Sequence, residues 1–84
     1  MDKNVADQNG WIDIREAHPE DLERVLTWNN RKDEPCIQVY NEEYYCWDTE
    51  DGDDFEYGID ETTNDGRLVI SHWQSLPKRP EVLQ

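Results

Sequence analysis

The residues of this chain that could carry out chemistry are two histidines, two cysteines and a dense group of carboxylates. His18 and His72 stand 54 residues apart, and Cys36 and Cys46 do not form a closely spaced pair. Zinc sites take thiolate and imidazole ligands at short, regular spacings, so this arrangement predicts no metal site. Two cysteines are also too few for a disulfide framework, and we expect both thiols to be reduced.

The carboxylates follow neither a catalytic nor a calcium-binding pattern. The calcium loop of helix–loop–helix proteins needs oxygen ligands at alternate positions, a glycine at its sixth position and a glutamate at its twelfth. None of Gly52, Gly58 and Gly66 gives a register that satisfies these positions. No activated nucleophile or glycine-rich phosphate loop accompanies the acids. We therefore expect no enzymatic activity, no cofactor and no small-molecule substrate.

The acids are concentrated in one part of the chain, residues 41–65, which we call the acidic segment. It holds eleven acids and no base to relieve their repulsion, and so contributes −11 to a net charge of −13. A solvated acidic tail is usually poor in aromatic residues. Here apolar side chains are interleaved with the acids: Tyr44, Tyr45, Trp47, Phe55, Tyr57 and Ile59. This pattern indicates a charged segment that is anchored in a fold.

Alternation of apolar and polar residues predicts the strands that must position these acids. We expect strands at 11–14, 35–40, 43–48, 55–59 and 67–73, with turns between them at Asp-Gly and Asn-Asp-Gly sequences. The fold class is then mainly β: one small antiparallel sheet with an aromatic core and at most one short helix, with a small α+β fold as the alternative. The expected core residues are Trp11, Ile14, Val25, Ile37, Val39, Trp47, Val69 and Trp73.

Residues 19–28 leave two interpretations open, helix or strand. A proline at a first-turn position, neighbouring acids, and Leu22, Val25 and Leu26 at helical spacing favour a helix of about ten residues. The same residues allow one turn followed by a strand at 24–28.

Two short motifs resemble a family of small bacteriophage and prophage proteins of unknown function. Trp11-Ile12-x-Ile14 opens the match, and Ser71-His72-Trp73-x-x-Leu76-Pro77-x-x-Pro80 closes it over about residues 10–80. The family has threonine in place of Ser71, proline in place of Ser75 and leucine in place of His18. The resemblance implies a phage context, no particular activity, and a strand at Val25-Leu26. We expect Trp73 in the core and His72 hydrogen-bonded to the Leu76-Pro77 turn.

A chain of 84 residues has room for one domain. We expect a flexible N-terminus at 1–9, a single domain at 10–80 and a C-terminal tail at 81–84. The first ten residues lack the apolar stretch of a signal peptide, and no apolar run approaches the roughly 20 residues of a membrane helix. We therefore expect no membrane partner and a location in the cytoplasm of a bacterial host cell.

The charge itself is the strongest indication of function. Carboxylates on a sheet face are separated by about 5–7 Å, along and across the strands, and the phosphates of duplex DNA are also several ångströms apart. We therefore expect an inhibitor that mimics nucleic-acid charge. Its partner would be a basic, nucleic-acid-binding host protein, such as a defence nuclease or a CRISPR effector complex, and it would not bind nucleic acid directly.

The expected partner-binding residues are Glu42, Glu43, Asp48, Glu50, Asp51, Asp53, Asp54, Glu56, Asp60 and Glu61. The alternative is a non-enzymatic accessory module that binds a protein through its Trp and Tyr side chains, with acidity that serves solubility. Mimicry requires ordered carboxylates on one surface, whereas solubility allows them to scatter.

Overall fold

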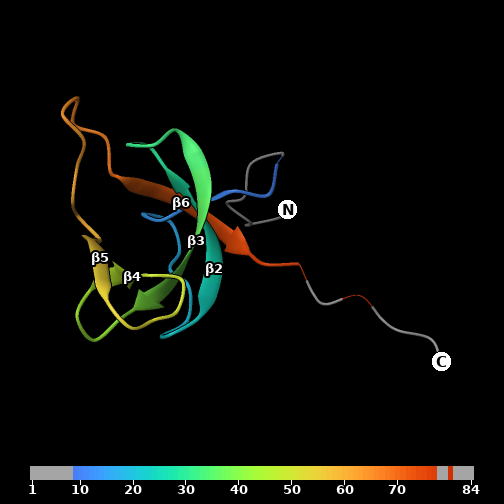
Figure 1. Ribbon diagram of the computed structural model, residues 1–84. Coiled ribbons are helices and arrows are strands. Elements are labelled where there is room, and N and C mark those ends of the chain that lie inside the picture. Colours follow the sequence, from blue (N-terminus) through green and yellow to red (C-terminus); the bar gives the residue numbers. More distant parts are fainter. Residues whose placement is uncertain (1–8, 78–79, 81–84) are drawn as a thin grey trace.

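The computed structural model of the protein describes residues 9–77 and 80, and these form a single antiparallel sheet (Figure 1). The strands are β1 (Ile12–Asp13), β2 (Arg24–Asn29), β3 (Glu34–Asn41), β4 (Cys46–Asp48), β5 (Phe55–Gly58) and β6 (Ile70–Ser75). Their order across the sheet is β1-β6-β2-β3-β4-β5. The described residues contain no helix, so the mainly β prediction is confirmed. The predicted tail at 81–84, and the predicted flexible N-terminus up to residue 8, lie outside the described residues.

Residues 19–28 form a turn followed by β2, which settles the question that the sequence left open. Leu22 adopts a positive φ of 63° and its backbone N–H donates to the carbonyl oxygen of Tyr40 at 2.6 Å. β2 then pairs with β3 on one side and β6 on the other. These two ladders give β2 backbone hydrogen-bond partners on both sides, which outweighs a weak local preference for helix. Leu22, which the helical pattern would bury, is 62% exposed.

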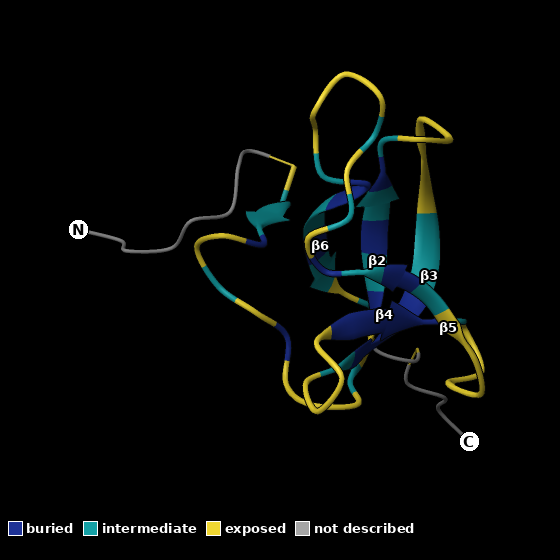
Figure 2. Cartoon of the chain, turned by 90° about the vertical axis from the view of Figure 1, so that its left-hand side faces the viewer, coloured by how far each residue is buried: buried dark blue, intermediate teal, exposed yellow. Residues whose placement is uncertain are grey.

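The core lies on one face of the sheet, the inner face, and four of its nine residues are aromatic. Figure 2 marks the buried residues along the chain in dark blue. The core contains Ile14, Val25, Tyr40, Trp47, Tyr57, Ile59, Val69, Ile70 and Trp73. Tyr40 and Trp47 meet edge to face with ring centroids 5.3 Å apart, an arrangement that stabilises aromatic pairs. Of the eight residues predicted for the core, all are buried except Trp11 and Ile37, which are half-buried.

Ile37 differs from its prediction because β3 carries apolar residues on both faces. Tyr40 and Gln38 face inward, so Ile37 and Val39 project from the opposite, outer face. Val39 is nevertheless buried, because the chain after β4 folds across it: a Cβ placed on Gly52 would lie 3.6 Å from Val39 Cγ2.

Buried polar residues on the inner face tie β5 to the centre of the sheet. The Thr27 hydroxyl donates to Gln38 Oε1 at 2.7 Å, and Gln38 Nε2 donates to Glu56 Oε1 at 3.0 Å. Asn29 Nδ2 donates to the Tyr57 hydroxyl at 3.3 Å. Buried polar groups need such partners, so these bonds fix β5 relative to β2 and β3.

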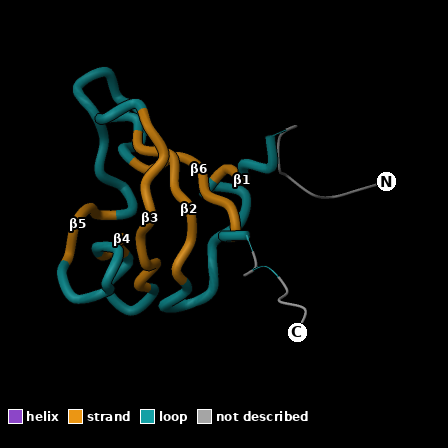
Figure 3. The backbone as a smooth tube through the Cα atoms, turned by 45° about the vertical axis from the view of Figure 1, so that its right-hand side comes forward, coloured by secondary structure: helices purple, strands orange, loops and turns teal. Residues whose placement is uncertain are grey.

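The outer face carries a second row of side chains, of which only Val39 is buried. The row is formed by alternate residues of neighbouring strands: Arg24, Leu26, Trp28, Ile37, Val39, His72 and Gln74. β1 and β5 form the two opposite edges of the sheet (Figure 3). No helix of the described residues is long and apolar enough to cross a membrane.

Candidate partner-binding surface

The acidic segment forms β4, β5 and the loops around them, at the edge of the sheet opposite β1. The ten predicted binding residues fall into three groups by exposure, which Figure 2 shows along the chain. Seven are exposed: Glu42, Glu43, Glu50, Asp51, Asp53, Asp54 and Asp60. Glu56 and Glu61 are half-buried, and Asp48 is buried.

Asp48 contradicts the expectation that all ten acids point outward. It is only 7% exposed, and it pairs with Val39 of β3 on one side and with Phe55 of β5 on the other. Its carboxylate, at the C-terminal end of β4, accepts hydrogen bonds from Asn41 Nδ2 at 3.0 Å and from the Cys46 thiol at 3.4 Å. Burial and the hydrogen bond to Asp48 raise the pKa of the Cys46 thiol to about 11. Asp48 therefore supports the strand and does not belong to the surface.

Glu56 and Glu61 also hold the fold together. Glu56 accepts from Gln38, as described above, whereas Glu61 Oε1 accepts from the backbone N–H of Gly58 at 3.1 Å. Arg31 reaches Glu61 Oε2 at 3.4 Å, and its guanidinium carbon also lies 5.6 Å from the centre of the Tyr57 ring. Both carboxylates thus have partners within the molecule.

Arginines from outside the acidic segment relieve part of its repulsion, which the sequence pattern alone did not suggest. Arg24 on β2 pairs with Glu50 at 2.8 Å, and Arg67 pairs with Asp65 at 3.0 Å. Hydrogen bonds from Thr63 and then from Arg67 lower the pKa of Asp65 to about 2. Exposed ion pairs of this kind contribute little to stability, because solvent screens them. They reduce the local charge without removing it.

The loop between β4 and β5, residues 49–54, is the most acidic exposed part of the molecule, and we call it the acidic loop. Its backbone is ordered by two hydrogen bonds, from Thr49 N to the Asp54 carbonyl at 2.8 Å and from Gly52 N to the Thr49 carbonyl at 2.8 Å. Gly52 supplies the positive φ of 77° that this turn requires.

Six exposed acids of the segment have no ion-pair partner among residues 9–77 and 80: Glu42, Glu43, Asp51, Asp53, Asp54 and Asp60. Half of them belong to the acidic loop. An ordered loop with unpaired carboxylates is a fixed source of negative potential.

The aromatic residues of the acidic segment have two different roles. Trp47 and Tyr57 anchor the segment in the core, as the sequence pattern indicated. The other three aromatic side chains point into solvent: Tyr44 is 72% exposed, Tyr45 is 55% exposed and Phe55 is 64% exposed. Large exposed aromatic side chains beside carboxylates are typical of protein-binding surfaces, and uncommon on surfaces that serve solubility alone.

His72 lies beside a serine and an aspartate, which invites comparison with a catalytic triad. The β-bulge opposite Trp28 brings neighbouring side chains together, so that Ser71 Oγ lies 2.7 Å from His72 Nδ1. His72 Nε2 is 3.9 Å from Asp13 Oδ2, which is too long for a hydrogen bond. His72 therefore contacts Ser71 and not, as predicted, the turn at Leu76-Pro77.

Asp13 is engaged elsewhere. Arg15 donates to both of its oxygens, at 3.0 and 2.7 Å, and this hydrogen bonding lowers the pKa of Asp13 to about 2. The Ser71 hydroxyl is likewise occupied, because Asn30 Nδ2 donates to it at 2.8 Å. A relay from carboxylate to imidazole to nucleophile is not assembled here. The absence of enzymatic activity remains a prediction.

Cys36 and Cys46 are free thiols, half-buried and buried respectively. Burial is the main cause that raises the pKa of the Cys36 thiol above its ordinary value. Within the described part of the chain, no three His, Cys, Asp or Glu side chains gather closely enough to hold a metal ion.

A family model matches residues 10–81, a range that includes all six strands and the whole acidic segment. The chain belongs to DUF551, a family of proteins of unknown function. No curated protein and no solved structure matches the chain.

In this DUF551 domain the opening and closing sequence motifs lie in one ladder. β1 pairs with β6 so that Ile12 stands opposite Trp73, and Asp13 stands opposite His72. Asn30, which no sequence motif singled out, links Trp28 and Ser71 by hydrogen bonds. An Asn-Asn pair at the end of a strand carries no sign in the sequence of which distant groups it will join.

Proposed function

We propose that this DUF551 protein is a non-enzymatic inhibitor that binds a basic, normally nucleic-acid-binding protein by presenting carboxylates in place of phosphates. The observation that supports this most directly is the acidic loop. Asp51, Asp53 and Asp54 are exposed there, on an ordered backbone, without ion-pair partners among the described residues. A role in solubility alone would not require the loop to be held in one conformation.

Electrostatics explains how such a surface would act. Carboxylates collected at one edge of the sheet steer a basic partner toward that edge and repel nucleic acid. Residual charge also costs stability through self-repulsion, which the arginine pairs offset only in part. Because the unpaired carboxylates lower the stability of the fold, their presence on the surface is best explained by a role in binding.

The phage context of the proposal comes from the motif resemblance alone. In a bacterial host the targets of an acidic inhibitor would be defence nucleases or CRISPR effector complexes, whose nucleic-acid channels are basic. The inhibitor would then act in the host cytoplasm and would occupy the channel in place of nucleic acid.

A second function is favoured by the exposed aromatic residues. Tyr44, Tyr45 and Phe55 would serve as anchors of an accessory interaction module, because aromatic side chains contribute most to protein–protein binding. In that case, removal of the three aromatic side chains would abolish binding, and neutralisation of the acids would not.

Affinity capture from a bacterial lysate tests the proposal. The protein is immobilised at low salt, about 50 mM, and bound proteins are eluted with a salt gradient. We expect a basic protein that elutes as salt rises and that competing duplex DNA or RNA also displaces. Elution only by detergent, without displacement by nucleic acid, would contradict mimicry and support the aromatic module.

A further inference from the structure

The outer face of the sheet carries a hollow that the acidic surface does not explain. It has a volume of about 370 Å³ and is lined by Asn9, Trp11, Trp28 and His72. Trp28 and His72 stand opposite each other on β2 and β6, and Trp11 comes directly before β1. Three ring-bearing side chains from three parts of the chain thus meet at one place, which we call the tryptophan hollow.

The two indoles form adjoining walls of the tryptophan hollow. The ring centroids of Trp11 and Trp28 are 5.9 Å apart and their planes meet at 72°. In this edge-to-face arrangement the face of one ring and the edge of the other border the same space. Both tryptophans are half-buried, so part of each ring reaches solvent.

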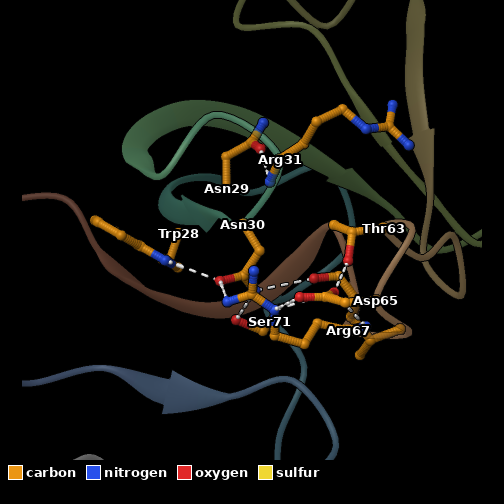
Figure 4. A network of polar contacts seen from close by, with 9 residues as sticks. Trp28, Asn29, Asn30, Arg31, Thr63, Asp65, Arg67 and Ser71 are labelled. Atoms are coloured by element: carbon orange, nitrogen blue, oxygen red, sulfur yellow. Dashed lines mark hydrogen bonds and ion pairs between the residues drawn. The ribbon is translucent and has the colours of Figure 1, made fainter.

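Hydrogen bonds connect the Trp28 wall to the His72 wall, and Figure 4 shows the part of this chain that runs from Trp28 through Asn30 to Ser71. Trp28 Nε1 donates to Asn30 Oδ1 at 3.1 Å, and Asn30 Nδ2 donates to Ser71 Oγ at 2.8 Å. Ser71 Oγ in turn lies 2.7 Å from His72 Nδ1. The chain of bonds orients the Trp28 indole relative to the imidazole before any ligand arrives, so less rotamer freedom is lost on binding.

The wall at Asn9 and Trp11 is also held in place. Gln74 Nε2 donates to the carbonyl oxygen of Asn9 at 3.4 Å. Gly10 allows this approach, with a positive φ of 88° and a position where a Cβ would lie 3.2 Å from Gln74 Oε1. Residues 9–11 therefore lie across β6 in a fixed conformation. A wall that is held in place in this way is typical of a binding site.

Charge decides which ligand such a hollow favours. The faces of indole rings are electron-rich and attract cations, and the net charge of −13 repels anions from the whole molecule. The acidic loop lies on the same side of the sheet, because Glu50 pairs with Arg24, which shares the outer face with Trp28. Trp28 lies four positions after Arg24 along β2, a distance of about 13 Å at the usual rise per residue.

We propose that the tryptophan hollow binds the guanidinium group of an arginine side chain. The arginine would come from the same basic partner, so the identity of its source rests on the proposed function. Guanidinium is planar and weakly hydrated, and it stacks on aromatic faces more readily than lysine does. The acidic loop steers the partner, and the hollow fixes the position of one of its arginines.

The test measures binding of N-acetylarginine amide, with N-acetylcitrulline amide as its neutral counterpart of nearly the same shape. Signals of the four indole N–H groups report the site, and those of Trp47 and Trp73 in the core serve as folding controls. We expect saturable shifts of the Trp11 and Trp28 signals. Arginine should bind about 2- to 30-fold more tightly than citrulline, the range that cation–π energies give at about 1.4 kcal/mol per tenfold.

Two variants of one residue make the test specific. Trp28→Ala should abolish the saturable binding, and Trp28→Phe, which keeps an aromatic face, should retain part of it. Phe55→Ala removes an exposed aromatic from β5 and should change nothing. Equal shifts with arginine and citrulline, or arginine binding that survives Trp28→Ala in a folded protein, would overturn the proposal.

Failure of this inference is distinguishable from failure of the proposed function. Replacement of Glu50, Asp51, Asp53 and Asp54 by their amides should weaken capture of the basic partner and leave the indole shifts with arginine amide in place. If the arginine shifts disappear with that replacement while Trp11 and Trp28 remain folded, arginine is held only by the field of the acidic loop. The tryptophan hollow would then not be its site.

Discussion

Asp48→Ala should destabilise the protein strongly, although Asp48 looks like every other acid of the segment in the sequence. The variant removes a buried acceptor and leaves Asn41 Nδ2 and the Cys46 thiol without their partner. A hydrogen bond to a charged group contributes about 1.5–3 kcal/mol, and an unsatisfied buried donor costs a similar amount. Relief of buried charge offsets part of this loss, and we expect a net cost of about 2–3 kcal/mol.

Urea unfolding at neutral pH, followed by tryptophan fluorescence, measures this cost. With an m value near 1 kcal/mol/M for a chain of this size, the midpoint should fall by about 2–3 M. Asp53→Ala is the matched control, because Asp53 is exposed and unpaired within the described residues, and its midpoint should move by less than about 0.5 M. If the two variants unfold at the same urea concentration, the division into structural and surface acids is wrong.

Three further outcomes follow from particular side chains. The Cys46 thiol, with its pKa of about 11, should resist alkylation at about pH 8 until the protein is unfolded, as mass spectrometry would show. The folded-state pKa of Asp13, about 2, lies below its ordinary 3.8, so the pair with Arg15 stabilises above pH 3.8 and is lost as pH falls through 2. Arg15→Gln should therefore lower the unfolding midpoint slightly at neutral pH and leave it almost unchanged near pH 2, measured by chemical denaturation. No hydrolase activity should copurify with the protein, and any turnover abolished by His72→Ala would contradict this.

Much of the fold could be predicted because alternation is a local property. Trp47 and Tyr57 stand at positions that only a strand pattern explains, and both are in the core. β2 was harder, because Leu22, Val25 and Leu26 fit a helix equally well. Pairing with β3 and β6 makes this segment a strand, and β6 lies far away in the chain. The outward position of Ile37 was equally hard to predict, because β3 is apolar on both faces and the pattern alone does not show which face is buried.

The surface was only partly predictable from composition. The sequence identified the acidic segment but could not separate Asp48 from Asp53, because burial depends on which strand lies on each side. It also could not show that Arg24 reaches Glu50 across the sheet. Trp11 and Trp28 were seen as separate aromatic residues, and their meeting requires the β1–β6–β2 order.

The central claim is that the position of the acids, and not their number, produces binding, and a pair of charge-matched variants tests it most directly. One variant replaces Glu50, Asp51, Asp53 and Asp54 by Gln or Asn. The other replaces four exposed acids outside the acidic segment in the same way: Glu16, Glu20, Asp33 and Glu34. Both variants lose the same charge from a total of −13.

Association of each variant with the captured basic partner is measured at about 50 mM salt. The acidic-loop variant should associate at least about tenfold more slowly than the parent protein, with an unchanged or increased unfolding midpoint. The control variant should slow association only by the small effect of net charge. Equal rates for the two variants would show that the acidic loop is not the binding surface, and would contradict nucleic-acid mimicry.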